Sequence, residues 1–340
     1  MIDEVLETIK NGNTLSEDEM RAAMSGIMEG QWSDAQITEF LVGLSKRGES
    51  VAEITGAANV MREKALPINA PEGAVDCCGT GGDKSGTYNI STAVAIVAAA
   101  CGVPVAKHGN RSASSKSGAA DVLEALGINL DVPQGKLEEA LKLYNFAFLM
   151  APRHHGAMKY VAPARKALGT RTIFNILGPL ANPAKTKHQL LGVFDRALVL
   201  PIAQVLQNLG TTSAWVVHGS DGLDEITTTG ETYITKLKNG KITEATLTPS
   251  DFGLPQSNPD DLIGGMPEMN AQALLNIMDG AKNAYRDIVV ANTAAVLIIA
   301  DKESDLEHAA ETAKQAIDTG RALELLNQYK AFTQEHGATA

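Results

Sequence analysis

The first 66 residues carry apolar side chains at helical spacing. An apolar stripe from Ile2 to Ile9 predicts a first helix, which Asn11-Gly12 ends. Three later runs each begin with a serine followed three residues on by Glu or Gln, the capping box of a helix start. These pairs are Ser16 with Glu19, Ser33 with Gln36, and Ser50 with Glu53. The pattern predicts a bundle of about four helices over residues 1–66, and the proline-containing link 67–73 predicts a domain boundary.

From Val75 onward, short apolar runs alternate with amphipathic ones. The apolar, β-branched runs predict buried strands at 103–106, 146–150, 190–194 and 214–218. Helices are predicted between them, at 91–100, 117–126, 137–143, 157–168 and 197–209, and four of these are followed by a glycine that suits a helix end: Gly102, Gly127, Gly169 and Gly210. This alternation indicates an α/β domain with a mostly parallel central sheet flanked by helices.

The C-terminal part predicts a hairpin and more helices. Residues 233–247 alternate around Asn239-Gly240, a turn signal for a β-hairpin. Helices are predicted at 271–278, 288–300 and 305–326, and the second of these is apolar all round and therefore buried. We expect residues 74–340 to form one α/β domain beside the small, all-helical N-terminal one.

Composition and charge narrow the class of protein. The chain has 340 residues, of which 40 are acidic and 29 basic, for a formal net charge of -11. Nucleic-acid binders usually have a basic footprint, so we expect no nucleic-acid partner. Three cysteines, Cys77, Cys78 and Cys101, give no disulfide framework, which indicates a reducing compartment. The N-terminus lacks the features of a signal peptide, and the apolar run 93–106 is too short to span a membrane, so we expect a cytoplasmic protein without a membrane partner.

The run from Asp76 to Thr92, DCCGTGGDKSGTYNIST, is the first candidate site. Its glycines lie between a predicted strand and a predicted helix. Glycine permits positive φ and lets backbone N–H groups come close to a ligand, and consecutive N–H groups bind anions. With a helix N-terminus behind it, such a loop is typical of a phosphate or diphosphate cradle. An ordinary strand-to-helix turn, where glycine supplies only the bend, remains the alternative.

Two further polar segments follow predicted strands, at the sheet edge where open α/β proteins bind ligands. Lys107 to Asp121, KHGNRSASSKSGAAD, is basic and rich in hydroxyl groups, which suits phosphate and ribose; a solvated polar loop is the alternative. His218 to Ile226, HGSDGLDEI, contains the adjacent carboxylates of Asp224 and Glu225. Opposite a phosphate cradle such a pair suits Mg²⁺, whereas alone it is more often a surface feature.

The remaining candidates are single residues. His154 and His155 are adjacent, but no Cys, His or Asp spacing completes a zinc site, which leaves a contact at the rim of a substrate site. Arg165 lies on the predicted helix 157–168 and either holds a substrate carboxylate or is a surface arginine. No residue is assigned as a catalytic acid, base or nucleophile.

Five motifs, in order, make the chain similar to the anthranilate phosphoribosyltransferases of the nucleoside phosphorylase/phosphoribosyltransferase superfamily. They are GTGGD at 79–83, NIST at 89–92, KHGNRS at 107–112 with the SSKSG that follows it, RTIFNILGPLANP at 171–183 and DGLDE at 221–225. The resemblance covers almost the whole chain. It implies that 1–66, joined by a later helical segment near 165–180, packs beside the α/β domain, and that two chains form a homodimer through the helical domain.

The resemblance also implies a reaction. The 5-phosphoribosyl group of 5-phosphoribosyl 1-diphosphate (PRPP) passes to the amine of anthranilate, and diphosphate leaves, in the second step of tryptophan synthesis from chorismate. The expected cofactor is Mg²⁺, with two ions per monomer. Because no base is evident, we expect a dissociative, oxocarbenium-like transition state and catalysis by positioning and electrostatics.

Site roles follow from the matching motifs. Those implied for PRPP are Gly79, Gly82, Asp83, Thr87, Asn89, Ile90, Ser91, Thr92, Lys107, His108, Gly109, Asn110, Arg111, Ser112, Ala113, Ser114, Ser115 and Ala119. Those implied for anthranilate are Gly79, Asn110 and Arg165. Those implied for metal are Ser91, Asp224 and Glu225.

The chain departs from the family pattern in two places. Ala119 stands where many members have serine, which removes one hydrogen bond to PRPP, of order 1 kcal/mol. Gly156 stands where proline is common, which affects the stiffness of that loop. Two alternatives to the reaction stay open: a pyrimidine-nucleoside phosphorylase, which needs a Lys/Ser phosphate signature not found here, and a catalytically silent relative that binds nucleic acid.

Overall fold

The computed structural model describes residues 2–83, 85–112 and 116–338, and its central feature is a seven-stranded sheet. The strands are β1 (Val75–Gly79), β2 (Val105–Gly109), β3 (Phe146–Met150), β4 (His188–Gly192), β5 (Ser213–Gly219), β6 (Thr232–Lys238) and β7 (Lys241–Leu247). Their order is β3-β2-β1-β4-β5-β6-β7. β1 to β5 are parallel, and β6 pairs antiparallel with both β5 and β7, so the prediction of a mostly parallel sheet is confirmed.

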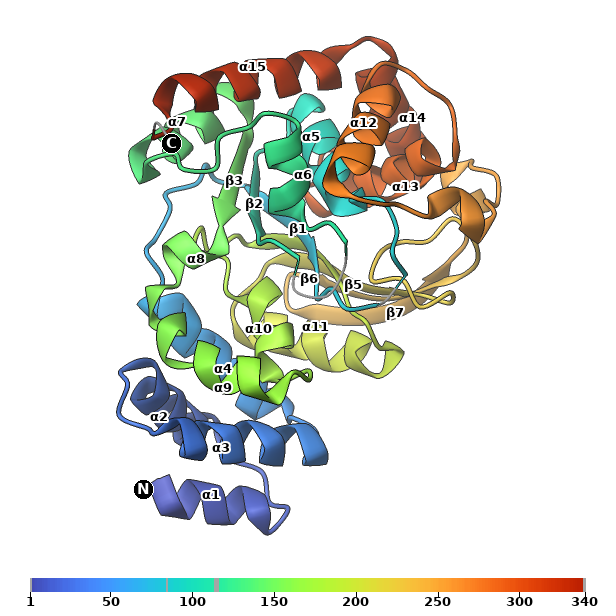
Figure 1. Cartoon of the computed structure of the whole chain (residues 1–340). Coiled ribbons are helices and arrows are strands. Elements are labelled where there is room, and N and C mark those ends of the chain that lie inside the picture. Colours follow the sequence, from blue (N-terminus) through green and yellow to red (C-terminus); the bar gives the residue numbers. More distant parts are fainter. Residues whose placement is uncertain (1, 84, 113–115, 339–340) are drawn as a thin grey trace.

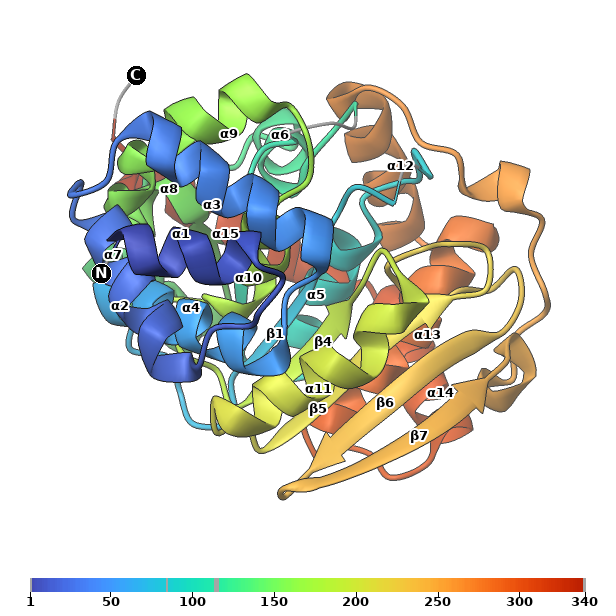
Figure 2. The same ribbon diagram turned by 90° about the horizontal axis from the view of Figure 1, so that it is seen from below.

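Helices cover both faces of the sheet, as Figures 1 and 2 show. One face packs mainly against α5 (Ile90–Ala100), α6 (Ala119–Ala125), α12 (Pro267–Met278), α13 (Ala284–Ile299), α14 (Leu306–Asp318) and α15 (Arg321–His336), and α7 (Gln134–Tyr144) lies beside β3. The other face packs against α11 (Val199–Asn208). Successive residues alternate between the layers: Leu190 joins the first core and Leu191 the second. This is the period of two expected of a strand.

A helical bundle lies beside α11 at one end of the molecule (Figure 1). It contains α1 (Ile2–Lys10), α2 (Glu17–Met28), α3 (Asp34–Arg47) and α4 (Val51–Lys64). The three predicted capping boxes at Ser16, Ser33 and Ser50 are confirmed. From later in the chain, α9 (Ala162–Leu168) packs on α3, and α10 (Ile173–Leu180) packs on α4.

Several element bounds differ from the prediction. The strand predicted at 103–106 runs from Val105 to Gly109 and that predicted at 190–194 runs from His188 to Gly192, because pairing with neighbouring strands sets their ends. The helix predicted at 157–168 is divided into a 3₁₀ turn (Gly156–Tyr160) and α9, which has proline in its first turn, and a short helix that was not predicted, α8 (Ala151–His154), precedes them. A 3₁₀ turn (Arg196–Leu198) precedes α11, and two more lie at Pro249–Phe252 and Pro259–Leu262.

Glycines with positive φ explain where several helices end and where the hairpin turns. The helix predicted at 305–326 is two helices, α14 and α15, because Gly320 has a φ of 76° and interrupts the helical path. The four predicted helix-ending glycines all have positive φ, and the Asn239-Gly240 turn joins β6 to β7 with positive φ at both residues. Within the described ranges, the helices are too short or too polar to cross a bilayer.

Candidate active site

The glycine-rich loop follows β1 at the carboxyl end of the parallel strands. Gly81, Gly82 and Gly86 have φ values of 66°, 74° and 65°, which L side chains rarely adopt. The loop is tied to the neighbouring strand, because Thr80 N–H donates to the Gly192 carbonyl at 2.9 Å. The predicted cradle is therefore a bent loop fixed to the sheet edge.

The acidic pair lies directly against this loop. Gly81 N–H donates to Oδ2 of Asp224 at 2.7 Å. Gly79 and Gly192 are paired across β1 and β4, and a Cβ atom on either would collide with Asp224: 2.2 Å from its Oδ2 at Gly79 and 1.5 Å from its backbone oxygen at Gly192. Both strands therefore need glycine where the acidic loop crosses them.

Side-chain hydrogen bonds hold the acidic loop in place. Asp221 accepts hydrogen bonds from the hydroxyls of Thr227 and Thr229 at 2.6 and 2.5 Å. Asn292 of α13 accepts from Ile226 N–H at 2.9 Å and donates to the Ile226 carbonyl at 2.8 Å. Sequence reasoning missed Asn292; the signal was an amide inside an otherwise apolar helix.

Crowded carboxylates dominate the electrostatics of the site. Burial and the nearby Asp83 carboxylate raise the pKa of Asp224 to about 6, although the Gly81 N–H opposes this. Burial and Asp224 raise the pKa of Glu225 well above its usual value, while Lys107 and the Ser91 N–H act in the opposite direction. A divalent cation would relieve this repulsion, so the oxygen donors fit Mg²⁺.

These residues do not form a complete metal cage. Among the described residues, no three His, Cys, Asp or Glu side chains are grouped to hold a metal. A Mg²⁺ ion at Asp224, Glu225 and the Ser91 hydroxyl would therefore take further ligands from substrate phosphate and water, as Mg²⁺ commonly does.

Lys107 and His108 lie within β2, not in the loop after it as predicted. Lys107 is 1% exposed, and its Nζ donates to the Cys77 carbonyl at 2.6 Å and to Ser91 Oγ at 3.1 Å. Its charge therefore lies beneath the start of α5, where it also faces Glu225. The His108 ring is buried, with Nδ1 3.2 Å from the Gly178 carbonyl.

The start of α5 brings together four predicted residues. Ser91 bonds both Lys107 and Glu225. Ile90 is buried in the core, so only its backbone is available to a ligand, and the Thr92 hydroxyl is buried without a hydrogen-bond partner among the described residues. The Asn89 side chain is held by Ser117.

Within the glycine-rich loop, two further predicted residues are linked through Ser85. Ser85 Oγ donates to Asp83 Oδ2 at 2.6 Å and lies 3.3 Å from Thr87 Oγ1. Asp83 is thus held inside the loop that also carries Gly82.

The segment after β2 is shaped by Asp121 of α6. Asp121 accepts from the backbone N–H groups of Ser112 and Gly118 at 3.0 and 2.8 Å. Asn110 is exposed, and the Arg111 guanidinium is paired with Glu124 and Asp121, so it faces α6. The predicted residues Ala113, Ser114 and Ser115 lie outside the described residues. Ala119 is the first residue of α6, and its Cβ is 3.5 Å from where a Cβ on Gly109 would be.

Arg165 and the histidine pair lie on the helical side of the molecule. The Arg165 guanidinium lies over the Phe174 ring at 5.4 Å, and within the described ranges it shares no hydrogen bond or ion pair with the other predicted site residues. His155 lies beside β2, because its ring centroid is 5.2 Å from that of His108. His154 Nδ1 is 3.0 Å from the Leu66 carbonyl.

Arg171 links the helical side to the glycine-rich loop. Its guanidinium donates to the Gly82 carbonyl and lies 4.0 Å from the centre of the Phe194 ring. The positive charge of Arg171 also lowers the pKa of Asp224, against the effect of burial. The sequence offered one signal for this role, namely the position of Arg171 at the start of the RTIFN motif.

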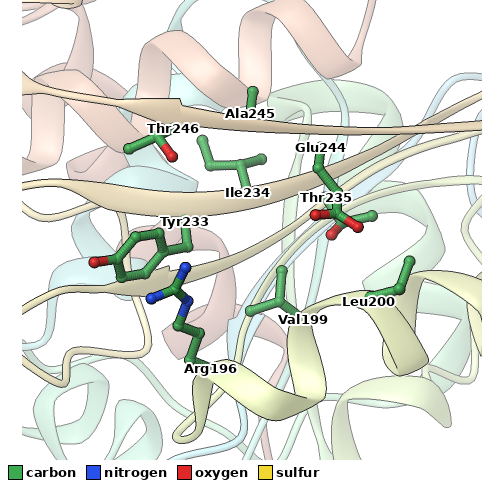
Figure 3. A pocket seen from close by; sticks show the side chains of 9 residues that line it. All are labelled: Arg196, Val199, Leu200, Tyr233, Ile234, Thr235, Glu244, Ala245 and Thr246. Carbon is green, nitrogen blue, oxygen red and sulfur yellow. The ribbon is translucent and has the colours of Figure 1, made fainter.

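A separate cavity of about 310 Å³ lies between α11 and the β6–β7 hairpin (Figure 3). The Arg196 guanidinium lies 3.6 Å from the centre of the Tyr233 ring there, and Glu244 supplies one carboxylate. None of the predicted site residues lines this cavity. The candidate site is instead the edge of the sheet around Gly81 and Asp224, where the glycine-rich loop meets the acidic pair.

Two family models match the chain. Residues 3–65 match the helical bundle domain of a glycosyl transferase family, and residues 71–323 match the α/β domain of a glycosyl transferase family. The anthranilate phosphoribosyltransferase of Rhodospirillum rubrum is 55% identical over 322 residues, which are 95% of this chain and 93% of that protein. The corresponding protein of Azospirillum brasilense is 54% identical, over 97% of this chain and 92% of its own.

Solved structures agree with these relatives. The crystal structure of anthranilate phosphoribosyltransferase from Thermus thermophilus has a TM-score of 0.92 and 40% identity, covering 97% of this chain and 99% of its own. The enzyme from Saccharomyces cerevisiae, in complex with PRPP and Mg, has a TM-score of 0.90 and 26% identity, covering 98% of both chains. The bundle and the α/β sheet are thus those of a glycosyltransferase. Identity over nearly the full length shows that the chain belongs to the anthranilate phosphoribosyltransferase family.

Proposed function

We propose that this chain transfers the 5-phosphoribosyl group from PRPP to the amine of anthranilate, giving N-(5-phosphoribosyl)anthranilate and diphosphate in tryptophan synthesis. The observation that carries this proposal is the 2.7 Å hydrogen bond from Gly81 N–H to Asp224 Oδ2. It joins the glycine-rich loop, which we assign to an anion, to the carboxylate pair, which we assign to a cation. A diphosphate with its divalent cation needs that combination.

The roles that the motifs imply for these residues support the assignment of each part of the substrate to a different segment of the chain. We assign the diphosphate to the loop from Gly79 to Thr87, and the ribose and 5-phosphate to Asn89–Thr92 and the segment after β2. Asp224, Glu225 and Ser91 would hold Mg²⁺, with two ions per monomer, and the metal supplies charge neutralisation to the leaving diphosphate. Arg165, Asn110 and Gly79 are assigned to anthranilate, where the guanidinium pairs with the carboxylate.

The residues of the chain act by orientation and charge. As the bond from ribose C1 to the diphosphate oxygen breaks, the backbone N–H groups of the loop stabilise the negative charge on the departing oxygen. The amine nitrogen of anthranilate then bonds to C1, and the amine proton passes to the neighbouring carboxylate of anthranilate itself. This route needs no protein base.

A fluorescence assay tests this function. Anthranilate fluorescence should fall when the protein, PRPP and Mg²⁺ are present together, and should stay constant when PRPP is left out. Replacing both Asp224 and Glu225 with alanine should lower kcat at least about a hundredfold and abolish binding of Mg²⁺ with diphosphate in calorimetry. The matched control is Glu138→Ala with Glu139→Ala, an adjacent acidic pair on α7, which should retain both signals. Full turnover of the Asp224/Glu225 variant at low Mg²⁺ would refute the metal assignment.

We further propose that two chains associate through the helical domain of residues 1–66, that the α/β domain spans 74–340, and that the protein works in the cytoplasm. The family resemblance supports the dimer, and the free thiols of Cys77, Cys78 and Cys101 support a reducing compartment. Sedimentation equilibrium should give twice the chain mass, and a single-chain mass would refute the dimer.

A further inference from the structure

Asn270 is a buried amide that belongs to none of the motifs of the site. It lies on α12 and is 1% exposed. Its Nδ2 donates to Asn89 Oδ1 at 2.8 Å, and its Oδ1 accepts from Gly265 N–H at 2.7 Å. A buried amide with both ends bonded fixes its partners closely, because breaking either bond would leave a polar group unpaired.

The Asn89 side chain occupies an unusual place for a helix N-cap. Asparagine at this position normally accepts a hydrogen bond from the first turn of its own helix. Within the described residues, Asn89 makes no such bond at the start of α5. Its Oδ1 instead accepts from Asn270 Nδ2 and from Ser117 Oγ at 3.2 Å, and its Nδ2 donates to the Ser117 carbonyl at 3.2 Å. The side chain is therefore turned away from the N–H groups that it would otherwise cap.

The same region of α12 also fixes the glycine-rich loop. Residues 262–265, which precede α12 and are here called the strap, run along this loop. Gly264 N–H donates to the Gly86 carbonyl at 2.8 Å, and Thr87 forms an antiparallel bridge with Ile263. A Cβ on Gly264 would lie 2.6 Å from the Thr87 carbonyl oxygen, so only glycine permits this approach. Asn270 bonds the strap at Gly265 and the helix start at Asn89 at the same time.

We propose that Asn270 is a positioning residue for the phosphoribosyl donor, a role that rests on the proposed function. By holding Asn89 away from the first turn of α5, it keeps the N–H groups there available to a phosphate. The buried hydroxyl of Thr92, which lacks a partner among the described residues, lies in that same turn. Without Asn270, Asn89 rotates to cap α5 and competes with the phosphate for the same donors.

Calorimetric titration with PRPP and Mg²⁺, without anthranilate, tests the proposal. Asn270→Ala should weaken PRPP binding about tenfold, the equivalent of one charge-assisted hydrogen bond, while kcat and the KM for anthranilate change less than about twofold. The control is Asn276→Ala, because Asn276 is on the same helix and bonds the exposed Gln272. It should bind PRPP like the parent.

A double-mutant cycle separates this role from a general loss of structure. Because Asn270 acts through Asn89, the effect of Asn270→Ala on the Kd for PRPP should largely disappear in an Asn89→Ala background. Full additivity of the two substitutions, or unchanged PRPP binding by Asn270→Ala, overturns the proposal. If Asn270→Ala does not fold, Asn270→Ser, too short to reach Asn89, takes its place with the same expected outcomes. Failure of the parent to consume anthranilate would instead refute the proposed function.

Discussion

Gly81 and Asp224 are 143 residues apart in the chain, yet the N–H of the first donates to Oδ2 of the second at 2.7 Å. The bond favours the ionised form of a carboxylate whose pKa burial raises. It also means that the glycine-rich loop and the acidic loop form one unit at the sheet edge. Any change that moves one loop must therefore disturb the other.

Gly192→Ala should disrupt this unit. The new Cβ would lie 1.5 Å from the backbone oxygen of Asp224, and backbone atoms cannot yield as the end of a flexible side chain does. We expect kcat to fall by at least about a hundredfold and the Mg²⁺ concentration for half-maximal rate to rise, because the carboxylates are displaced. The control is Gly135→Ala on α7, where a Cβ meets nothing within 4 Å. Steady-state assays over a Mg²⁺ series make the comparison, and an unimpaired Gly192→Ala enzyme would contradict the expected clash.

Local signals explain which parts of the fold could be predicted from the sequence. The capping boxes at Ser16, Ser33 and Ser50 and the Asn239-Gly240 turn depend on residues three or fewer positions apart, and all are found in the structure. Strand ends were less predictable, because they depend on pairing with strands far away in the chain. For this reason the prediction placed Lys107 in a loop, whereas it lies inside β2.

The residues of the candidate site also differ in how well the sequence predicts them. Glycines and adjacent carboxylates at strand ends could be read from the sequence because the chemistry of phosphate and Mg²⁺ requires those residue types. Asn292 and Arg171 left only weak signals and Asn270 left none, since each acts on a segment at least 66 residues away. Their residue types are common in helices and loops, and only the folded chain shows their contacts.

Arg165→Ala tests the assignment of Arg165 to the anthranilate site. If the guanidinium pairs with the substrate carboxylate, the KM for anthranilate should rise about tenfold or more, while the KM for PRPP changes less than about twofold. Lys166→Ala is the matched control, because Lys166 is an exposed cation on the same helix. Initial rates with each substrate varied in turn give the two constants. A larger change in the KM for PRPP would show that Arg165 serves the other substrate.

Arg62→Met tests how the helical bundle is attached to the sheet layer. Arg62 of α4 donates to the carbonyl of Leu180 at the end of α10 at 2.6 Å, and to that of Leu209 after α11 at 3.5 Å. Burial lowers the pKa of Arg62 to about 10, and the two helix ends supply the compensating negative charge. Its loss should lower the free energy of unfolding by about 2 kcal/mol, because two buried carbonyl groups lose a donor.

The control for this prediction is Arg21→Met. Arg21 bonds Glu63 on the surface of the bundle at 2.7 Å, and exposed pairs contribute roughly 0–1 kcal/mol. Urea unfolding of both variants measures the difference. Equal losses would mean that the junction of α4 with α10 and α11 does not depend on Arg62.

The last prediction concerns stability below neutral pH. Burial and the neighbouring His155 lower the pKa of His108 from 6.5 to about 3, and burial lowers the pKa of His155 to about 4. The unfolded chain therefore binds more protons than the folded one as the pH falls below 6.5. The stabilising contribution is complete above that value and is lost progressively toward the folded pKa values. From pH 7.5 to pH 5, each histidine should lower the free energy of unfolding by about 2 kcal/mol.

His155→Gln should remove one of these contributions. Urea unfolding at pH 7.5 and pH 5 should show a pH-dependent loss smaller by about 2 kcal/mol than in the parent. The Nε2 atoms of His108 and His155 are buried without hydrogen-bond partners among the described residues, so protonation would leave a charge that no neighbour compensates. An unchanged pH dependence in the His155 variant would mean that the ring is protonated as readily in the folded chain as in the unfolded one.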